Sequence, residues 1–91
     1  MTPLEHIRQS IRDRNYILCG HAEDEMYADD LERADVEHAL LNGTISRKFT
    51  DDPRGPRYRI AGPARNGRPI CIVCRFREVN GLIIITVYAK D

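Results

Sequence analysis

Long apolar runs are missing from this sequence. No stretch approaches the roughly 20 consecutive apolar residues that a membrane-spanning helix needs, and the opening MTPLEHIRQS lacks the apolar core of a secretory signal. Cysteine is also scarce: there are 3, an odd number that favours reduced thiols over a disulfide framework. We therefore expect a protein of the cytoplasm with no membrane partner.

A metal or cofactor motif is missing too. Cys71 and Cys74 have CxxC spacing, but a structural zinc site needs a tight turn between its two thiols. These two lie inside a strongly β-forming run, where they should point to opposite faces of a strand. The chain also has no glycine-rich phosphate-binding loop. We expect neither a set of metal ligands nor a cofactor.

Net charge is the third absence, because 14 basic and 14 acidic side chains cancel. A neutral chain at first argues against a nucleic-acid partner. The charge is divided unevenly, however: residues 1–43 have a balance of −6 and residues 44–91 a balance of +6. Eight of the ten cations in the second half are Arg, whose planar, forked donors suit phosphate. Two interpretations stay open: a phosphate-binding half, or two halves that neutralise each other across their interface.

The length of 91 residues suits one domain, and its first half predicts helices. Thr2 can cap a helix that starts at Pro3, and Glu5 completes a capping box. Gly43 is a natural stop for the last helix of this half. The predicted helices cover residues 3–14, 21–27 and 34–42, with a short extended piece at residues 16–19.

The second half predicts an antiparallel sheet, because apolar residues there recur with a period of two. Four strands are expected, at residues 44–50, 57–61, 69–77 and 82–89. The expected fold is therefore a single α+β domain spanning residues 1–91. Its helices, within about residues 3–43, would pack on one face of a four-stranded antiparallel sheet at about residues 44–89.

The last two strands are expected to form a hairpin, since Asn80-Gly81 is a strong signal for a two-residue turn. That turn would place Arg75 opposite Thr86. Arg75, Thr86 and Tyr88 would converge on one face, with Lys90 beside them. The other face would be wholly apolar and covered by the helices, and it would consist of Ile72, Cys74, Phe76, Ile85, Val87 and Ala89.

The neighbouring strand can pair in two registers. A strict two-residue turn at Asn66-Gly67 would bury Arg57 and Arg59, which is costly for unpaired cations. A register shifted by one residue turns Tyr58 inward instead and brings both arginines to the face of Arg75. We predict the shifted register.

Five residues are candidates for chemistry. His21 follows a glycine at a helix start, where an imidazole paired with a carboxylate one turn later can act as a base or acid. Arg57, Arg75 and Lys90 can stabilise the charge of a phosphoryl transition state, and Tyr88 lies beside them. The plainer interpretations stay open: a locally hydrogen-bonded imidazole, and a solvated basic face.

Several short motifs stand out along residues 16–89: Gly20-His21-Ala22 with Met26, Asp35-Val36-Glu37 with Ala39-Leu40 and Gly43, Arg57-Tyr58, Gly67-Arg68-Pro69, and Ile84-Ile85-Thr86-Val87-Tyr88. As a set they resemble the domain-of-unknown-function 4258 family. That family is similar in layout to the RelE- and MqsR-like toxins, with N-terminal helices packed on a twisted antiparallel sheet. The resemblance implies RNA cleavage without a metal ion, and His21, Arg57 and Tyr88 fall on its recurring positions.

We therefore expect a metal-independent endoribonuclease, the toxin of a bacterial toxin–antitoxin pair, which cleaves RNA by attack of the ribose 2′-hydroxyl. His21 would act as general base or acid, and Arg57 and Arg75 would hold the scissile phosphate. Tyr88 and Lys90 would position or protonate it. The expected partners are RNA, including mRNA on the ribosome, and a small antitoxin; a second copy of the chain is a further candidate. The alternative is a non-catalytic module that binds protein or RNA.

Overall fold

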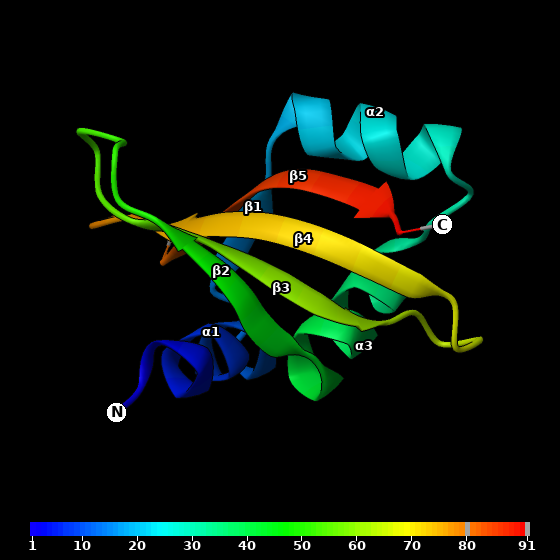
Figure 1. Ribbon diagram of the computed structural model, residues 1–91, viewed down its shortest axis with the longest axis horizontal. Coiled ribbons are helices and arrows are strands. Elements are labelled where there is room, and N and C mark those ends of the chain that lie inside the picture. The colour runs from blue at the N-terminus through cyan, green and yellow to red at the C-terminus, as the bar shows by residue number, and fades with distance from the viewer. Residues whose placement is uncertain (80, 91) are drawn as a thin grey trace.

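The first helix begins where the sequence supplies a capping box. The computed structural model describes residues 1–79 and 81–90 (Figure 1). The Thr2 hydroxyl accepts a hydrogen bond from the Glu5 amide at 3.2 Å, and the Glu5 carboxylate accepts one from the Thr2 amide at 3.4 Å. This confirms the predicted capping box. The helices are α1 (Pro3–Arg12), α2 (Gly20–Ala28) and α3 (Arg33–Asn42).

The described residues form one mixed sheet of five strands: β1 (Tyr16–Leu18), β2 (Thr44–Phe49), β3 (Arg57–Pro63), β4 (Pro69–Phe76) and β5 (Leu82–Ala89). Their order across the sheet is β1-β5-β4-β3-β2. β1 runs parallel to β5, and the other neighbours are antiparallel. The α+β class is therefore confirmed, but the prediction of four antiparallel strands is wrong. The additional strand is β1, which corresponds to the predicted extended piece at residues 16–19. Its three residues are too few to show a period.

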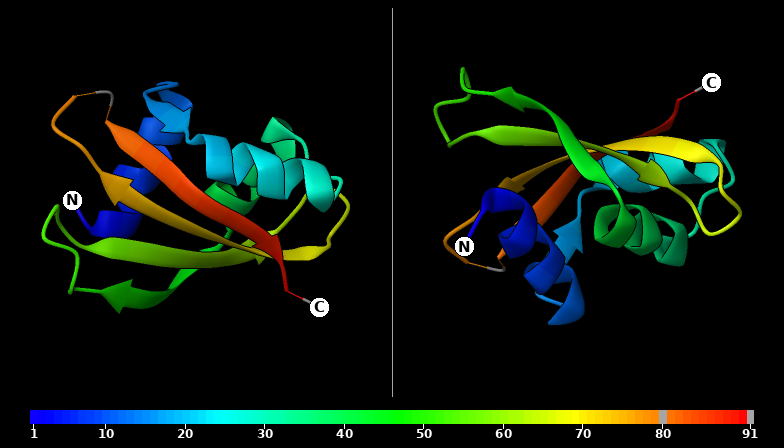
Figure 2. Two further views of the ribbon diagram at one scale, coloured as in Figure 1. Left: turned by 90° about the horizontal axis from the view of Figure 1, so that it is seen from above. Right: turned by 60° about the horizontal axis from the view of Figure 1, so that its bottom comes forward.

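The core lies between the sheet and the helices α1 and α3, which cover one face of it (Figure 2). We refer to this side as the inner face and to the opposite side as the outer face. Helix α2 lies alongside β5 (Figure 1). Fully buried side chains come from both layers and include Ile7, Val36, Leu40, Ile60, Ile72, Cys74, Leu82, Ile84 and Val87.

Strand β3 takes the predicted shifted register against β4. Arg57 lies opposite Arg75, and Tyr58, on the inner face, is only 7% exposed. The alternative register, which would bury two cations beneath the helices, is avoided because of its desolvation cost.

The β4–β5 hairpin differs from its prediction. Val73, rather than Arg75, lies opposite Thr86. Residues 77–81 connect the two strands, so the connection is longer than a two-residue turn. Asn80, on which the predicted turn depended, lies outside the described residues. The longer connection displaces the whole of β5 along β4.

A bulge in the same hairpin changes which residues of β5 face the core. Ile85 is an extra residue on β5, because Thr86 pairs with Val73 and Ile84 pairs with Cys74. Ile84 is consequently fully buried on the inner face, where Ile85 was predicted. An inserted residue reverses which side chains of a strand face inward from that point on. This is why the prediction of Ile85 as a core residue is wrong.

Helix α2 covers the part of the β5 edge that β1 leaves open. β1 pairs only with Leu82–Ile84. Farther along, the Glu25 carboxylate accepts a hydrogen bond from the Val87 amide at 3.0 Å, and the Asp29 carboxylate accepts one from the Ala89 amide at 3.1 Å. These contacts satisfy edge amides that would otherwise be open to another strand.

Candidate functional site

The outer face of the sheet carries four arginines. Arg47 on β2 lies opposite Arg59 on β3, and Arg57 on β3 lies opposite Arg75 on β4. Residues that oppose each other in a sheet share a face, and alternate residues of β3 do so too, so all four side chains project from one side. Like charges placed opposite each other are destabilising. Negative charge close to these pairs would relieve the repulsion.

An aromatic ring lies among these cations. Phe49 on β2 lies opposite Arg57. The guanidinium carbon of Arg47 is 4.9 Å from the centre of the ring, and that of Arg57 is 5.4 Å away. Such contacts hold a guanidinium group over an aromatic face without neutralising its charge.

Tyr88 is a second aromatic residue of the outer face. It lies opposite Cys71 on β4 and beside Arg59. Burial and the neighbouring Cys71 thiol raise the pKa of the Tyr88 phenol, against the opposite effect of Arg59. The phenol is therefore protonated at neutral pH, where it can donate a proton.

A carboxylate of the chain itself lies against the Arg57–Arg75 pair. Oδ2 of Asp52, in the loop between β2 and β3, is 3.7 Å from Nε of Arg57 and 3.9 Å from Nε of Arg75. Oδ1 accepts hydrogen bonds from the backbone amide and the Nε of Arg54, at 2.9 and 3.2 Å. The side chain of Asp52 is only 5% exposed. Hydrogen bonds from Arg54 hold the pKa of this carboxyl below its usual value, with a smaller contribution from the charge of Arg75.

A tight turn places Asp52 in this position. The Gly55 amide donates to the Asp52 carbonyl oxygen at 3.0 Å, with Pro53 second in the turn. Asp, Pro and Gly at the first, second and fourth positions are typical of a type I turn. The sequence thus predicts the loop but not a role for Asp52, since no local pattern indicates its contact with arginines on β3 and β4.

His21 lies at the start of α2, beside the β5 edge. Its Nε2 is 3.3 Å from Oε1 of Glu25, one turn later, and the imidazole side chain is 67% exposed. The same carboxylate oxygen accepts the hydrogen bond from the Val87 amide. The predicted pairing with a carboxylate is confirmed, and the imidazole is oriented by a group that is itself attached to the sheet.

The structure brings two of the five candidate residues together, Arg57 and Arg75. Tyr88 lies opposite Cys71, four residues before Arg75 on β4, which corresponds to about 13 Å along the strand. Lys90 is exposed just beyond the end of β5. The longer hairpin connection and the bulge move Tyr88 two residues along β4 from its predicted position, which separates it from Arg75.

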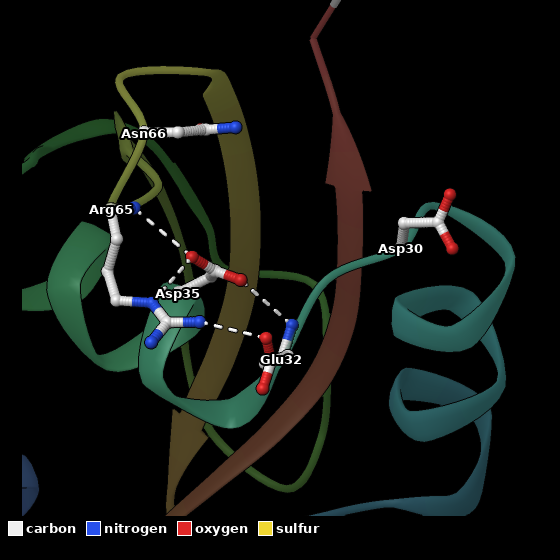
Figure 3. A pocket seen from close by; sticks show the side chains of 5 residues that line it. All are labelled: Asp30, Glu32, Asp35, Arg65 and Asn66. Atoms are coloured by element: carbon white, nitrogen blue, oxygen red, sulfur yellow. Dashed lines mark hydrogen bonds and ion pairs between the residues drawn. The ribbon is translucent and has the colours of Figure 1, made fainter.

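A second polar cluster surrounds a depression of about 420 Å³ at the start of α3 (Figure 3). Arg65 donates from Nε to the Asp35 carboxylate at 3.0 Å and from a terminal nitrogen to the Glu32 carboxylate at 3.0 Å. The other Asp35 oxygen accepts from the Glu32 amide at 2.9 Å. Because Arg65 is paired with carboxylates of the cluster itself, we interpret the cluster as a structural contact that holds the β3–β4 turn against α3.

The thiols and carboxylates do not form a metal site in the part of the chain that the structure describes, where no three candidate ligands come close together. Cys71 lies on the outer face and Cys74 on the inner face, as a continuous strand requires. Burial raises the pKa of the Cys74 thiol to about 12. Within residues 1–79 and 81–90, the helices are also too short or too polar to cross a bilayer.

A family model matches most of the chain. Residues 18–89 match the model described as Domain of unknown function (DUF4258). Comparisons with curated proteins and with solved structures found no match. The matched segment extends from the last residue of β1 to the end of β5 and so contains the whole outer face described above. Since the match covers well over half of its residues, the chain belongs to the domain-of-unknown-function 4258 family.

Proposed function

We propose that this protein binds single-stranded RNA across the outer face of its sheet and cleaves it, as the toxin of a bacterial toxin–antitoxin pair. The observation that carries the proposal is a set of four arginines on one face of three neighbouring strands, Arg47, Arg57, Arg59 and Arg75. Guanidinium groups suit phosphate oxygens, and aromatic rings among them stack on unpaired bases. Tyr88 supplies such a ring on the same face, and the Phe49 ring holds the guanidinium groups of Arg47 and Arg57.

Cleavage is proposed from the layout of the elements together with the groups on the outer face. Helices α1 and α3 cover one face of the antiparallel strands β2–β5 and leave the other face open (Figure 2). From the family resemblance we infer that the RelE- and MqsR-like toxins share this layout. Tyr88 lies on the open face and His21 lies beside the β5 edge, and in this proposal they are the proton donor and acceptor that attack by a ribose 2′-hydroxyl requires.

In the proposed reaction the ribose 2′-oxygen forms a bond to the adjacent phosphorus, and the bond from phosphorus to the 5′-oxygen breaks. His21, exposed at the β5 edge, takes the proton of the 2′-hydroxyl. Tyr88 gives its proton to the departing 5′-oxygen, because a phenol whose pKa lies above the ordinary value of 10.0 carries its proton at neutral pH. Arg59, beside Tyr88, contacts the scissile phosphate. The products carry a 2′,3′-cyclic phosphate and a 5′-hydroxyl.

The remaining candidates hold other parts of the RNA. Arg57 and Arg75 lie about 13 Å along the strand from the level of Tyr88. They therefore bind a neighbouring phosphate in this proposal, and the scissile phosphate is assigned to Arg59. Lys90, exposed beyond β5, contacts the RNA backbone on the other side of Tyr88.

The test is an RNA cleavage assay with purified protein in the presence of a metal chelator, with analysis of the product ends. We expect cyclic-phosphate and 5′-hydroxyl ends, and an activity about 100-fold lower for Tyr88→Phe, because general acid catalysis is lost. Tyr27→Phe is the matched control, since Tyr27 is 88% exposed on α2. RNA that stays intact with the wild-type protein, or a Tyr88→Phe variant as active as wild type, would refute the proposal.

An antitoxin is the expected protein partner. Segments of acidic side chains suit the outer face because its four arginines present positive charge. Co-expression with such an antitoxin should restore growth that the protein alone arrests. Binding of RNA or of a protein without cleavage and without growth arrest would favour the alternative, a non-catalytic interaction module.

A further inference from the structure

The Arg57–Arg75 pair contains two donors that the described residues do not satisfy. The Nε atoms of both side chains are buried and have no hydrogen-bond partner there. Oδ2 of Asp52, at 3.7 and 3.9 Å, is close enough to attract their charge but lies beyond hydrogen-bond distance. A buried donor without a partner costs free energy. The Asp52 carboxylate therefore offsets the charge of the two guanidinium groups without accepting a hydrogen bond from either Nε atom.

Building on the proposed function, we propose that Arg57 and Arg75 form a site for one phosphate group, which Asp52 occupies in the free protein and leaves when phosphate binds. A phosphate group is tetrahedral, so its free oxygens lie in more than one plane, and one oxygen can face each Nε–H group. The two guanidinium groups then gain charge-assisted hydrogen bonds that the planar carboxylate does not provide. A phosphodiester of RNA and free phosphate share this chemistry.

The site can be reached from solvent. A depression of about 390 Å³ borders it, lined by Arg54, Arg75, Phe76, Arg77, Glu78 and Val79. Three of these six residues are arginines and one is acidic, so the approach favours an anion. Asp51 and Pro53, on either side of Asp52, are exposed. Displacing Asp52 thus requires the movement of a surface loop and leaves the core in place.

Asp52 also forms the turn of this loop, and a test must separate that role from its charge. Its side chain accepts a hydrogen bond from the Arg54 amide two residues later. Asn retains a carbonyl oxygen that can accept this bond, and Ser retains a hydroxyl that can do so more weakly. Asp52→Asn and Asp52→Ser therefore remove the charge while keeping the turn.

The experiment is a titration with inorganic phosphate, followed by ¹⁵N–¹H NMR spectra of the arginine Nε–H groups. We expect the resonances of Arg57 and Arg75 to shift, and both Asp52 variants to bind phosphate about fivefold more tightly than wild type. Asp51→Asn is the matched control, because Asp51 is 84% exposed and 3.9 Å from a terminal nitrogen of Arg57. Its affinity for phosphate should stay within about twofold of wild type.

Equal phosphate affinity in the wild type and both Asp52 variants would overturn the inference, as would a titration that leaves both Nε–H resonances unmoved. A parallel titration with a short oligouridylate separates the inference from the proposed function. If the oligonucleotide binds all variants equally without moving these resonances, RNA binding stands and the Asp52 site fails. If phosphate binds as expected but the oligonucleotide does not, the phosphate site stands and RNA binding fails.

Discussion

At the scale of single residues, Asp35 connects the start of α3 to the β3–β4 turn. Its carboxylate accepts hydrogen bonds from Nε and the backbone amide of Arg65 and from the amide of Glu32. These bonds, that of the Arg65 side chain above all, lower the pKa of Asp35 to about 2. Because this value lies below the ordinary 3.8, the charged carboxylate stabilises the folded state at neutral pH.

We predict that Asp35→Asn lowers the free energy of unfolding at pH 7 by about 1 kcal/mol, since solvent screens part of the interaction. In the wild type, the contribution of Asp35 is complete above about pH 4 and is lost as the pH falls toward 2, because the folded state must then take up the proton. The variant should lack this part of the pH dependence. Urea unfolding at pH 7 and pH 3 measures both effects.

Asp30→Asn is the control for this prediction. Asp30 borders the same depression but is exposed (Figure 3). Its substitution should leave stability within about 0.5 kcal/mol of wild type at pH 7. If Asp35→Asn and Asp30→Asn change the free energy of unfolding equally, the contacts of Asp35 do not stabilise the packing of the β3–β4 turn against α3.

At the scale of elements, the end of α3 packs against β3 through a glycine. A Cβ atom on Gly62 would overlap the carbonyl oxygen of Ala39 in the last turns of α3. Gly62→Ala should therefore lower the free energy of unfolding by about 2 kcal/mol, because the helix must move away from the sheet. Thermal or urea unfolding measures the change. Gly20→Ala is the control: nothing lies within 4 Å of its added Cβ, and a stability loss equal to that of Gly62→Ala would contradict the explanation.

The helices and the long strands could be predicted because their signals are local. A capping box marks where α1 begins, and alternation marks β3 and β4. The pairing of β1 with β5 could not be predicted, because three residues show no period and their partner lies more than 60 residues away along the chain. The Ile85 bulge has no local signal either, since it depends on how the hairpin connection closes.

In the candidate site too, features with a local sequence signal were predictable and contacts between distant residues were not. Arg57 opposite Arg75 was predictable from the cost of burying unpaired cations, and His21 with Glu25 from helical spacing. The contact of Asp52 with both arginines was not, because a loop residue can face many directions and its sequence neighbours do not select one.

At the scale of the whole molecule, the positive charge of the second half of the chain is concentrated partly on the outer face of the sheet. Part of it is neutralised between the two halves, as Arg65 shows by pairing with Asp35 and Glu32. Arg47 and Arg59 lie elsewhere, on the outer face, and form no ion pair with a described acidic residue. The interpretation of neutralising halves therefore describes part of the molecule, and the arginines of the outer face that form no described ion pair are those on which the proposed phosphate binding depends.

The central claim, that the outer face binds RNA through its arginines, is tested most directly by the salt dependence of RNA binding. Fluorescence anisotropy with a labelled oligouridylate would be compared for the wild type, the double variant Arg47→Gln/Arg59→Gln, and Arg12→Gln on α1. Each contact with a single-strand phosphate contributes about −0.7 to the slope of log K against log salt concentration. We predict a slope less steep by about 1.4 for the double variant and an unchanged slope for Arg12→Gln. The same slope for all three proteins would contradict the claim.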